Sequence, residues 1–425
     1  MTNKSLLRLL SIFFLISIQN FSAQEILKES SPDEVGMSRE RLNRITNRFQ
    51  KYVDDGELPG VVILVARKGE IPYFKAIGYS DLEKKEPIQK NTIFRIASQT
   101  KALVSLGVLI LQEQGKLVIN EDVGKYLPSF YNINVAVKNE DGSFNLEPPK
   151  QNITIRDLLR HTSGVSYGDG FTKDVWEKNG ITGWYFAEKE RPILETVNQI
   201  ATLPFDAHPG EQFVYGYNTD ILGALIEVVS GKTLEAYLEE EILKPLEMTD
   251  THFYLPESKA SRLSVVYANS DQGLERLPET GGIFSQGAYI EGPRKSFSGG
   301  AGYLSTAMDY LKFLQMMLNN GVYKDKRIIS RKTVELMTSN HLGDIEYPWG
   351  DGVGFGLGFY VLENVGELGQ LGSKNEYGWS GAYHTTYWVD PQEELIVLYF
   401  TQLLRAGNIK DRDVLRALVY QSITD

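Results

Sequence analysis

The stretch GVVILVA, residues 60–66, is where the fold of this chain can first be inferred, because a β-branched run of this length predicts a strand. Lys68 and Gly69 can form a turn after it, and residues 73–79 can return as a second strand. Before the run, Ser38 can cap a helix. In that helix the apolar residues recur at helical spacing: Leu42, Ile45, Phe49 and Tyr52.

Strand character returns near the other end of the chain. Three segments carry it: GFGLGFYVLE (354–363), YHTTYWVD (383–390) and ELIVLYFTQ (394–402). Asp390-Pro391 predicts a turn between the last two, and DRDVLRALVYQSI closes the chain as a helix. The simplest packing is one antiparallel sheet built from both chain ends and covered by helices, an α+β arrangement.

Helical patterns fill the middle of the chain. ITIRDLLRH and TDILGALIEVVSG are examples, joined by long loops with Pro and Gly. We therefore expect one catalytic unit over residues 24–425, with a sheet part at roughly 24–120 and 296–425 and an inserted, mainly helical part at roughly 121–295. A pocket is expected where the two parts meet.

The first residues are typical of an export signal. Lys4 and Arg8 flank a largely apolar core of ten residues, 9–18, and Ala23 offers a small residue for cleavage, so that residues 1–23 would be removed. The apolar core is too short to span a bilayer of roughly 30 Å, although an uncleaved N-terminal anchor is the alternative. We expect a periplasmic or secreted protein with no stable membrane insertion after cleavage.

Composition excludes several classes of protein. The 425 residues contain no cysteine, which rules out disulfides and a thiol nucleophile, and the net charge is −11. A chain without a basic cluster is a poor partner for nucleic acid or an anionic membrane. The five histidines are scattered and no H-E-x-x-H occurs, so no metal site is predicted.

The stretch RIASQTKALV, residues 95–104, carries the first chemical signal. Ser98 precedes Lys101 by three residues, so both side chains lie on one face of the predicted helix. Burial disfavours a charged ammonium, so this lysine can take the serine proton and make the hydroxyl a nucleophile. A capping serine with a solvent-reaching lysine is the alternative, since S-x-x-K alone is a weak motif.

Two further segments are candidates for the same site as Ser98 and Lys101. In PGEQFVYGYNTDILGALIEVVSG (209–231), Tyr215 lies in a loop before a helix and can present its hydroxyl to a pocket. In YGWSGAYHTTYWVD (377–390), Trp379-Ser380-Gly381 enters a strand, and an edge strand can donate backbone N–H groups to an oxyanion. Taken singly, each segment is equally compatible with ordinary core packing.

These segments, with LLRHTSGVSYG and SGGAGYLSTAMDYLKF, resemble in order and spacing the serine hydrolases related to class C β-lactamases, and most of all their family VIII carboxylesterases. The resemblance runs from about Ser38 to the C-terminus, and it implies the β-lactamase/penicillin-binding-protein fold and no cofactor. It matches Ser98 to the acylated nucleophile, Lys101 to the activating lysine and Tyr215 to the tyrosine that shares proton transfers.

The resemblance also implies contacts with the substrate. Trp379, Ser380 and Gly381 match the third motif, and the backbone N–H groups of Ala382 and Ser98 would form the oxyanion hole. Family members often carry Asn two residues after the tyrosine. Here that position is Tyr217 and Asn218 follows it, so both are candidates for contact with the substrate.

The expected activity is hydrolysis of a small ester or amide through an acyl-enzyme. Trp379 brings no cation to the third motif, so a carboxylate-bearing β-lactam would lose a charge-assisted contact of about 1.5–3 kcal/mol, which favours neutral esters. The alternatives are a β-lactamase or D-amino-acid peptidase and, from another class, an inactive binder of cell-wall fragments. The aromatic loop (Tyr167, Phe171, Trp176, Trp184, Tyr185, Phe186) can line the pocket or pack on itself.

A rival nucleophile is Ser166 in Gly164-Val165-Ser166-Tyr167-Gly168, which matches G-x-S-x-G. That motif needs a strand before it and a helix after it, whereas here a helical pattern precedes it and no helical period follows at once. We therefore interpret the match as coincidental.

Overall fold

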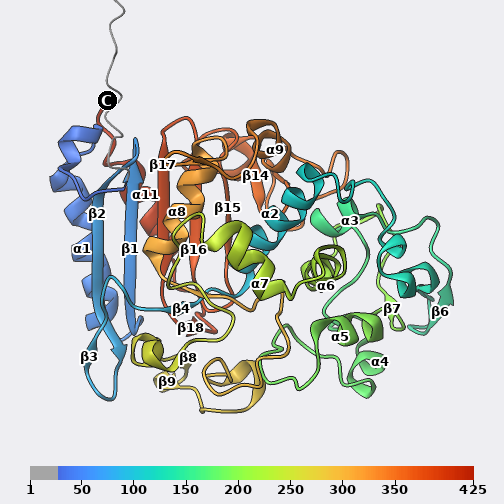
Figure 1. Ribbon diagram of the computed structural model, residues 1–425. Coiled ribbons are helices and arrows are strands. Elements are labelled where there is room, and N and C mark those ends of the chain that lie inside the picture. The colour runs from blue at the N-terminus through green and yellow to red at the C-terminus, as the bar shows by residue number, and fades with distance from the viewer. Residues whose placement is uncertain (1–26) are drawn as a thin grey trace, which may run out of the picture.

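A computed structural model describes residues 27–425, and the predicted leader lies outside these residues. One eight-stranded antiparallel sheet forms its centre (Figure 1). In spatial order its strands are β13 (Val353–Phe355), β14 (Tyr360–Leu362), β15 (Tyr377–Ser380), β16 (Thr386–Asp390), β17 (Leu395–Phe400), β1 (Gly60–Arg67), β2 (Glu70–Asp81) and β3 (Glu86–Pro87). The sheet therefore joins the two ends of the chain, as predicted.

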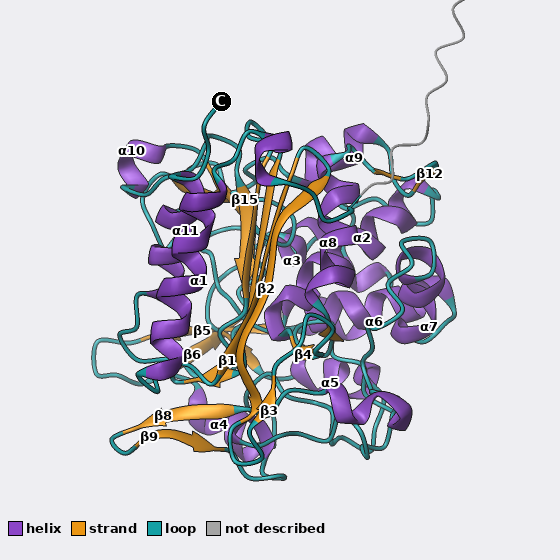
Figure 2. Cartoon of the chain, turned by 90° about the vertical axis from the view of Figure 1, so that its left-hand side faces the viewer, coloured by secondary structure: helices purple, strands orange, loops and turns teal. Residues whose placement is uncertain are grey.

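The junction of the two chain ends is the pair β1–β17. Its register aligns Val62 with Phe400 and Arg67 with Leu395. Every residue of β1 is buried, because helices cover both faces of the sheet (Figure 2). This explains why residues 60–66 are continuously apolar rather than alternating.

Two helices, α1 (Arg39–Asp54) and α11 (Asp411–Tyr420), pack on one face of the sheet (Figure 2). Ser38 caps α1 by accepting a hydrogen bond from the backbone N–H of Arg41, as predicted. The apolar face of α1 meets Val61, Ile63 and Val65 of β1. The other face of the sheet carries α8 (Ala307–Leu318), which contacts β17 and β1.

The helical part contains α2 (Thr100–Glu113), α3 (Ile155–Leu159), α4 (Lys173–Lys178), α5 (Ile193–Ile200), α6 (Asn218–Ser230) and α7 (Leu234–Leu238); α9 (Arg331–Met337) and α10 (Val365–Leu368) lie later in the chain. Although α2 was assigned to the sheet part, it packs against α6 and α7. Gly107 permits this approach, because a Cβ there would lie 2.7 Å from Leu238.

The helical part also contains strands that the sequence did not predict. These are β5 (Asn134–Lys138), β6 (Phe144–Glu147) and β7 (Pro204–Phe205) in one small sheet, and β8 (Tyr267–Ser270) and β9 (Gly273–Arg276) with β18 (Leu403–Leu404) in another. Two further pairs are β4 (Phe94–Arg95) with β10 (Leu304–Ser305), and β11 (Val322–Tyr323) with β12 (Lys326–Arg327). They are short, so their hydrophobic pattern is weak.

Two predicted strands have different bounds. Residues 354–363 form β13 and β14 with a turn between them, where Gly358 has a φ of 110°. Residues 377–390 form the hairpin β15–β16, whose turn spans residues 381–385. Both glycine-containing segments turn back on themselves, which alternation of side chains alone does not reveal.

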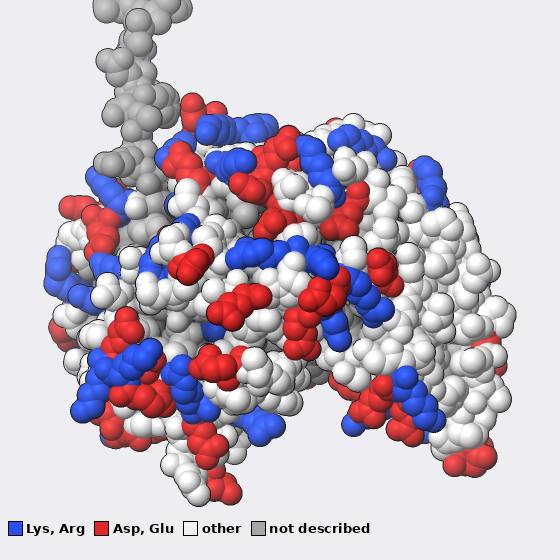
Figure 3. All heavy atoms as spheres, turned by 60° about the horizontal axis from the view of Figure 1, so that its bottom comes forward, with Lys and Arg blue, Asp and Glu red and all other residues white. Residues whose placement is uncertain are grey.

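The described surface carries charges of both signs. On the face drawn in Figure 3, Lys and Arg are interspersed with Asp and Glu, and an area without charged residues lies beside them. Within residues 27–425, no helix has the length and apolar character needed to cross a membrane.

Candidate active site

The Ser98 side chain lies at the start of the buried helix. A short 3₁₀ turn, Ala97–Gln99, leads directly into α2, so Ser98 precedes the helix rather than capping it. Ala97 has a φ of 43°, which is uncommon for a residue with a Cβ. Such backbone strain concentrates at functional sites, where the surrounding structure holds it in place.

Lys101 is fully buried one turn along α2. Its Nζ lies 3.3 Å from Ser98 Oγ and 3.1 Å from the Tyr167 hydroxyl. It also donates a hydrogen bond of 2.7 Å to the carbonyl of Gly300. The structure therefore brings the predicted serine and lysine together, and it excludes the alternative of a lysine that reaches solvent.

Tyr215 lies at the same centre, but its hydroxyl has a different partner from the one expected. The indole N–H of Trp379 donates to it at 3.2 Å, while Lys101 Nζ lies 4.6 Å from the centre of the Tyr215 ring. The phenol in hydrogen-bond contact with Lys101 is that of Tyr167. Burial raises the pKa of the Tyr167 hydroxyl well above 10, so it stays protonated.

The sequence places Tyr167 only in an aromatic loop and does not reveal its contact with Lys101. A second residue not expected from the sequence is Asp220, a buried carboxylate on α6 whose Oδ1 accepts hydrogen bonds from the Ser298 hydroxyl and the Gly300 N–H. Burial raises the pKa of Asp220. Asp220 thereby fixes Gly300, whose carbonyl oxygen accepts a hydrogen bond from Lys101. The sequence feature that could have indicated this role is an acidic residue within an apolar helical run.

The third motif lies beside the serine. Trp379, Ser380, Gly381 and Ala382 line the same pocket as Ser98. β15 is an interior strand rather than an edge, but its pairing with β14 stops at Gly378, so the segment from Trp379 onward is open on that side.

Gly381 is required by a close approach of two backbones. A Cβ at this position would lie 2.4 Å from the carbonyl oxygen of Ile96 and 2.4 Å from Thr385 Oγ1. The contact seats the turn against the residues that precede Ser98. Within residues 27–425, the N–H groups of Ser98 and Ala382 have no hydrogen-bond partner, which leaves two donors beside the pocket.

Tyr217 and Asn218 do not line the pocket, so the expectation that they contact substrate is wrong. Both are fully buried. Tyr217 donates to the carbonyl of Gly183 and packs against Tyr167, with ring centres 4.9 Å apart. Asn218 accepts from Ser163 and donates to His161 Nδ1 at 2.9 Å. Both side chains therefore lie in the core behind the site, where Asn218 contacts His161 and Tyr217 contacts Tyr167.

His161 is buried behind Tyr215, with ring centres 4.7 Å apart. Burial and, secondarily, the charge of Lys101 hold its pKa well below 6.5, so the ring is neutral. A neutral, buried ring that accepts or donates hydrogen bonds within the core has a structural role here. Ser166 is buried in a loop with no strand before it, which confirms that the G-x-S-x-G match lacks the context of a nucleophile.

The pocket has a volume of about 570 Å³ and two kinds of lining. Aromatic side chains supply much of the lining: Tyr167, Trp184, Tyr215, Tyr347, Trp349, Trp379 and Trp388. Tyr347 and Trp349 come from a loop before β13 that sequence analysis did not single out. The far end is polar, with Gln370 and with Arg412, Asp413 and Arg416 from α11. Trp379 brings no cation to the third motif, as expected from its residue type, but two arginines, Arg412 and Arg416, line the same pocket.

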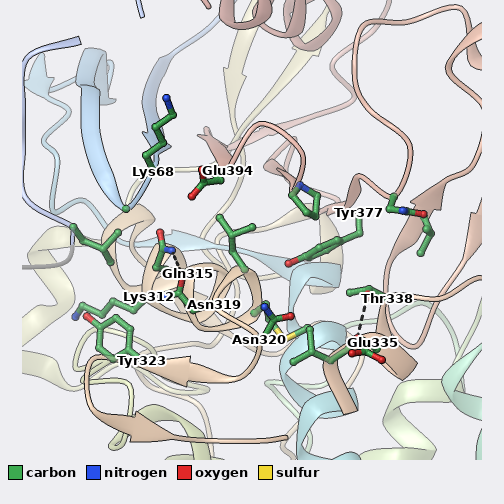
Figure 4. A pocket seen from close by; sticks show the side chains of 18 of the residues that line it. Lys68, Lys312, Gln315, Asn319, Asn320, Tyr323, Glu335, Thr338, Tyr377 and Glu394 are labelled. Carbon is green, nitrogen blue, oxygen red and sulfur yellow. Dashed lines mark hydrogen bonds between the residues drawn. The ribbon is translucent and has the colours of Figure 1, made fainter. Parts of the chain in front are cut away.

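A larger cavity of about 1490 Å³ lies elsewhere, lined from α8, α9 and the ends of β14 and β15 (Figure 4). Its side chains include Lys68, Gln315, Tyr377 and Glu394. None of Ser98, Lys101 and Tyr215 lines it. Volume alone would therefore misplace the site, and the arrangement of nucleophile, base and N–H donors identifies the smaller pocket.

A serine with a buried lysine one turn away, phenols beside that lysine and free N–H groups opposite defines a serine hydrolase site. The Beta-lactamase family profile matches residues 45–421, so the chain belongs to that family. The fold agrees, since it is the β-lactamase/penicillin-binding-protein arrangement that the resemblance implied.

Individual relatives include both esterases and peptidases. Esterase EstB of Burkholderia gladioli is 30% identical over 385 residues, which is 86% of this chain and 91% of EstB. A putative D-alanyl-D-alanine carboxypeptidase of Escherichia coli strain K12 is 27% identical over 88% of this chain and 85% of its own. Among solved structures, EstCE1, a hydrolase with promiscuous acyltransferase activity, superposes with a TM-score of 0.75 at 26% identity, covering 90% of this chain and 99% of EstCE1.

Proposed function

We propose that the chain is a carboxylesterase that works through an acyl-enzyme on Ser98. The observation that carries this proposal is the Ser98–Lys101 pair at 3.3 Å, opening into a pocket whose inner wall is aromatic. An aromatic wall favours the hydrocarbon part of an ester through burial of apolar surface. The names of EstB and EstCE1 support ester chemistry.

In the first step Ser98 Oγ attacks the ester carbonyl while Lys101 takes the hydroxyl proton. The N–H groups of Ser98 and Ala382 stabilise the negative oxygen, and loss of one such donor costs about 3 kcal/mol. As the intermediate collapses, the proton passes from Lys101 to the leaving alcohol, with Tyr215 beside the path. Water then attacks the acyl group while Lys101 takes one of its protons, and Lys101 passes that proton to Ser98 Oγ as the acid leaves, which restores the free enzyme.

The contacts of Tyr167 and Gly300 give Lys101 a fixed direction. A lysine has four rotatable bonds, so holding Nζ from two sides lowers the entropic cost of placing it at the serine. We therefore assign Tyr167 the role of positioning Lys101, and Tyr215 that of sharing proton transfers from the pocket side.

Parallel assays test the proposal. The purified chain without residues 1–23 is incubated separately with p-nitrophenyl butyrate, nitrocefin and a D-alanyl-D-alanine peptide. After each incubation the mass of the peptide that contains Ser98 is measured by mass spectrometry. We expect rapid ester hydrolysis, a transient acyl mass on Ser98, and loss of both in Ser98→Ala. Faster turnover of nitrocefin or of the peptide would instead favour the β-lactamase or peptidase, a possibility that the carboxypeptidase relative supports. An unlabelled Ser98 throughout would favour a binder of cell-wall fragments.

Export is part of the proposal. The charged flank and apolar core of residues 1–23 support removal of a leader and a periplasmic or secreted location. N-terminal sequencing of the protein from a cell-envelope fraction tests this, and a chain that starts at Met1 in the cytoplasm would refute it.

A further inference from the structure

Arg412 lines the polar end of the active-site pocket with almost no partner of its own. Its guanidinium makes one side-chain hydrogen bond, a long one of 3.4 Å from Nη2 to the carbonyl of Thr385. Its Nε is buried with no partner, and no ion pair within residues 27–425 includes it. The residue is partly exposed to the pocket, and a half-buried charge without an ionic partner favours contact with an anion.

The neighbouring acidic groups do not supply that anion. Asp411 accepts hydrogen bonds from His384, at 2.9 Å, and from the Tyr399 hydroxyl. Asp413 is exposed, and its Oδ1 accepts from Gln370 at 3.4 Å. Neither carboxylate lies within 4.0 Å of the Arg412 guanidinium nitrogens.

Arg416, which lines the same pocket, differs from Arg412 because it has an anionic partner. It lies one turn further along α11 and also lines the pocket, but both of its Nη atoms donate to the buried carboxylate of Glu376 at 2.7 Å. Arg412 has the same helical face and no such partner. A cation in the first turn of a helix is also opposed by the helix dipole, so Arg412 does not serve to stabilise α11.

Arg412 is linked to the turn that carries the proposed oxyanion donor. The Thr385 carbonyl that accepts from Arg412 also accepts from the N–H of Gly381 at 2.8 Å. Ala382 follows Gly381 directly. A ligand that reached Arg412 would therefore lie next to the turn that holds the carbonyl oxygen of a substrate.

We propose that Arg412 binds a carboxylate of the substrate, so that the esters this enzyme takes carry a negative charge at a distance from the bond that is cleaved. The proposal rests on the proposed esterase function and names its substrate class. The planar fork of an arginine suits a carboxylate, which it can bind through two parallel hydrogen bonds. The aromatic wall then holds the apolar part of the same molecule.

The test compares matched esters with and without the charge. On the acyl side, p-nitrophenyl hemisuccinate is compared with p-nitrophenyl butyrate; on the alcohol side, 4-acetoxybenzoate is compared with its methyl ester. The measured quantity is the ratio of kcat/KM for the anionic ester to that for the neutral one. We expect Arg412→Gln to lower this ratio about tenfold or more in one of the two pairs, mainly through KM, and Arg412→Lys to restore part of it.

Two variants control for charge. Lys410→Gln removes the same charge from an exposed residue next to α11 that does not line the pocket, and the ratio should stay unchanged. Asp413→Asn removes the carboxylate that opposes a bound anion, and the ratio should rise. The melting temperature of each variant shows that it is folded.

The result that overturns the proposal is a ratio unaffected by Arg412→Gln in both pairs while Ser98 is still acylated. The esterase assignment then stands without its anionic substrates. If instead no ester is hydrolysed and Ser98 takes no label, the proposed function itself is wrong, so the two failures are distinguishable.

Discussion

Replacing Gly381 by alanine is expected to disable the oxyanion hole while leaving the nucleophile in place. The new Cβ would start 2.4 Å from the carbonyl oxygen of Ile96 and must move out to at least about 3.0 Å. Ile96 contributes a backbone atom, which cannot rotate away as a side chain can, so the turn that carries the Ala382 N–H has to shift. Because N–H···O bonds have donor–acceptor distances of about 2.7–3.2 Å, a donor displaced by several tenths of an ångström is weakened in its interaction with the oxyanion.

The expected cost follows from known losses of one such donor, which are about 10²–10³ in kcat, or about 3–4 kcal/mol of transition-state stabilisation. We expect Gly381→Ala to lower kcat for p-nitrophenyl butyrate about a hundredfold, with KM much less affected. Ala382→Gly is the matched control, because it keeps the backbone N–H. A folded Gly381→Ala protein with kcat within about threefold of the parent would refute the placement of the oxyanion hole.

Three further predictions concern the residues around Lys101. Tyr167→Phe removes the hydroxyl 3.1 Å from Lys101 Nζ and should slow acylation of Ser98 in stopped-flow measurements about ten- to a hundredfold; an unchanged rate would contradict the positioning role. Asn218→Ala leaves buried partners unpaired and should lower the free energy of unfolding in urea by about 2–4 kcal/mol with little change in KM, whereas a large rise in KM would restore a role in substrate contact. Because the pKa of His161 lies well below 6.5, the unfolded chain binds a proton that the folded chain does not, and stability should fall as pH drops below about 6.5. In His161→Gln that fall should be shallower between pH 6.5 and 5, and an unchanged slope would count against a neutral ring.

The sheet and the nucleophile could be predicted from sequence because both produce local patterns. The run at residues 60–66 and the helix cap at Ser38 depend on neighbours in the chain, and S-x-x-K depends on one turn of helix. The hairpin turn at residues 381–385 was missed, since Gly381 responds to the carbonyl of Ile96, which lies far away in the sequence.

The partners of the catalytic groups could not be predicted, because they are set by packing between distant segments. Tyr167 reaches Lys101 from a loop, and Arg412 reaches the pocket from the last helix. The prediction that Tyr217 and Asn218 contact the substrate was wrong for a related reason. Their spacing from Tyr215 suggested the pocket, but the helix α6 begins at Asn218 and turns both side chains inward.

The joining of β1 to β17 has a consequence for the newly made chain. Ser98 and Lys101 are synthesised early, whereas β15 and the turn after it, which complete the site, come near the end. Pairing between segments so far apart must wait for synthesis of the C-terminal strands and is slow to form. An unfinished or truncated polypeptide therefore contains the serine but lacks the turn whose N–H group would stabilise the oxyanion. We expect hydrolysis to begin only when the last strands have been added.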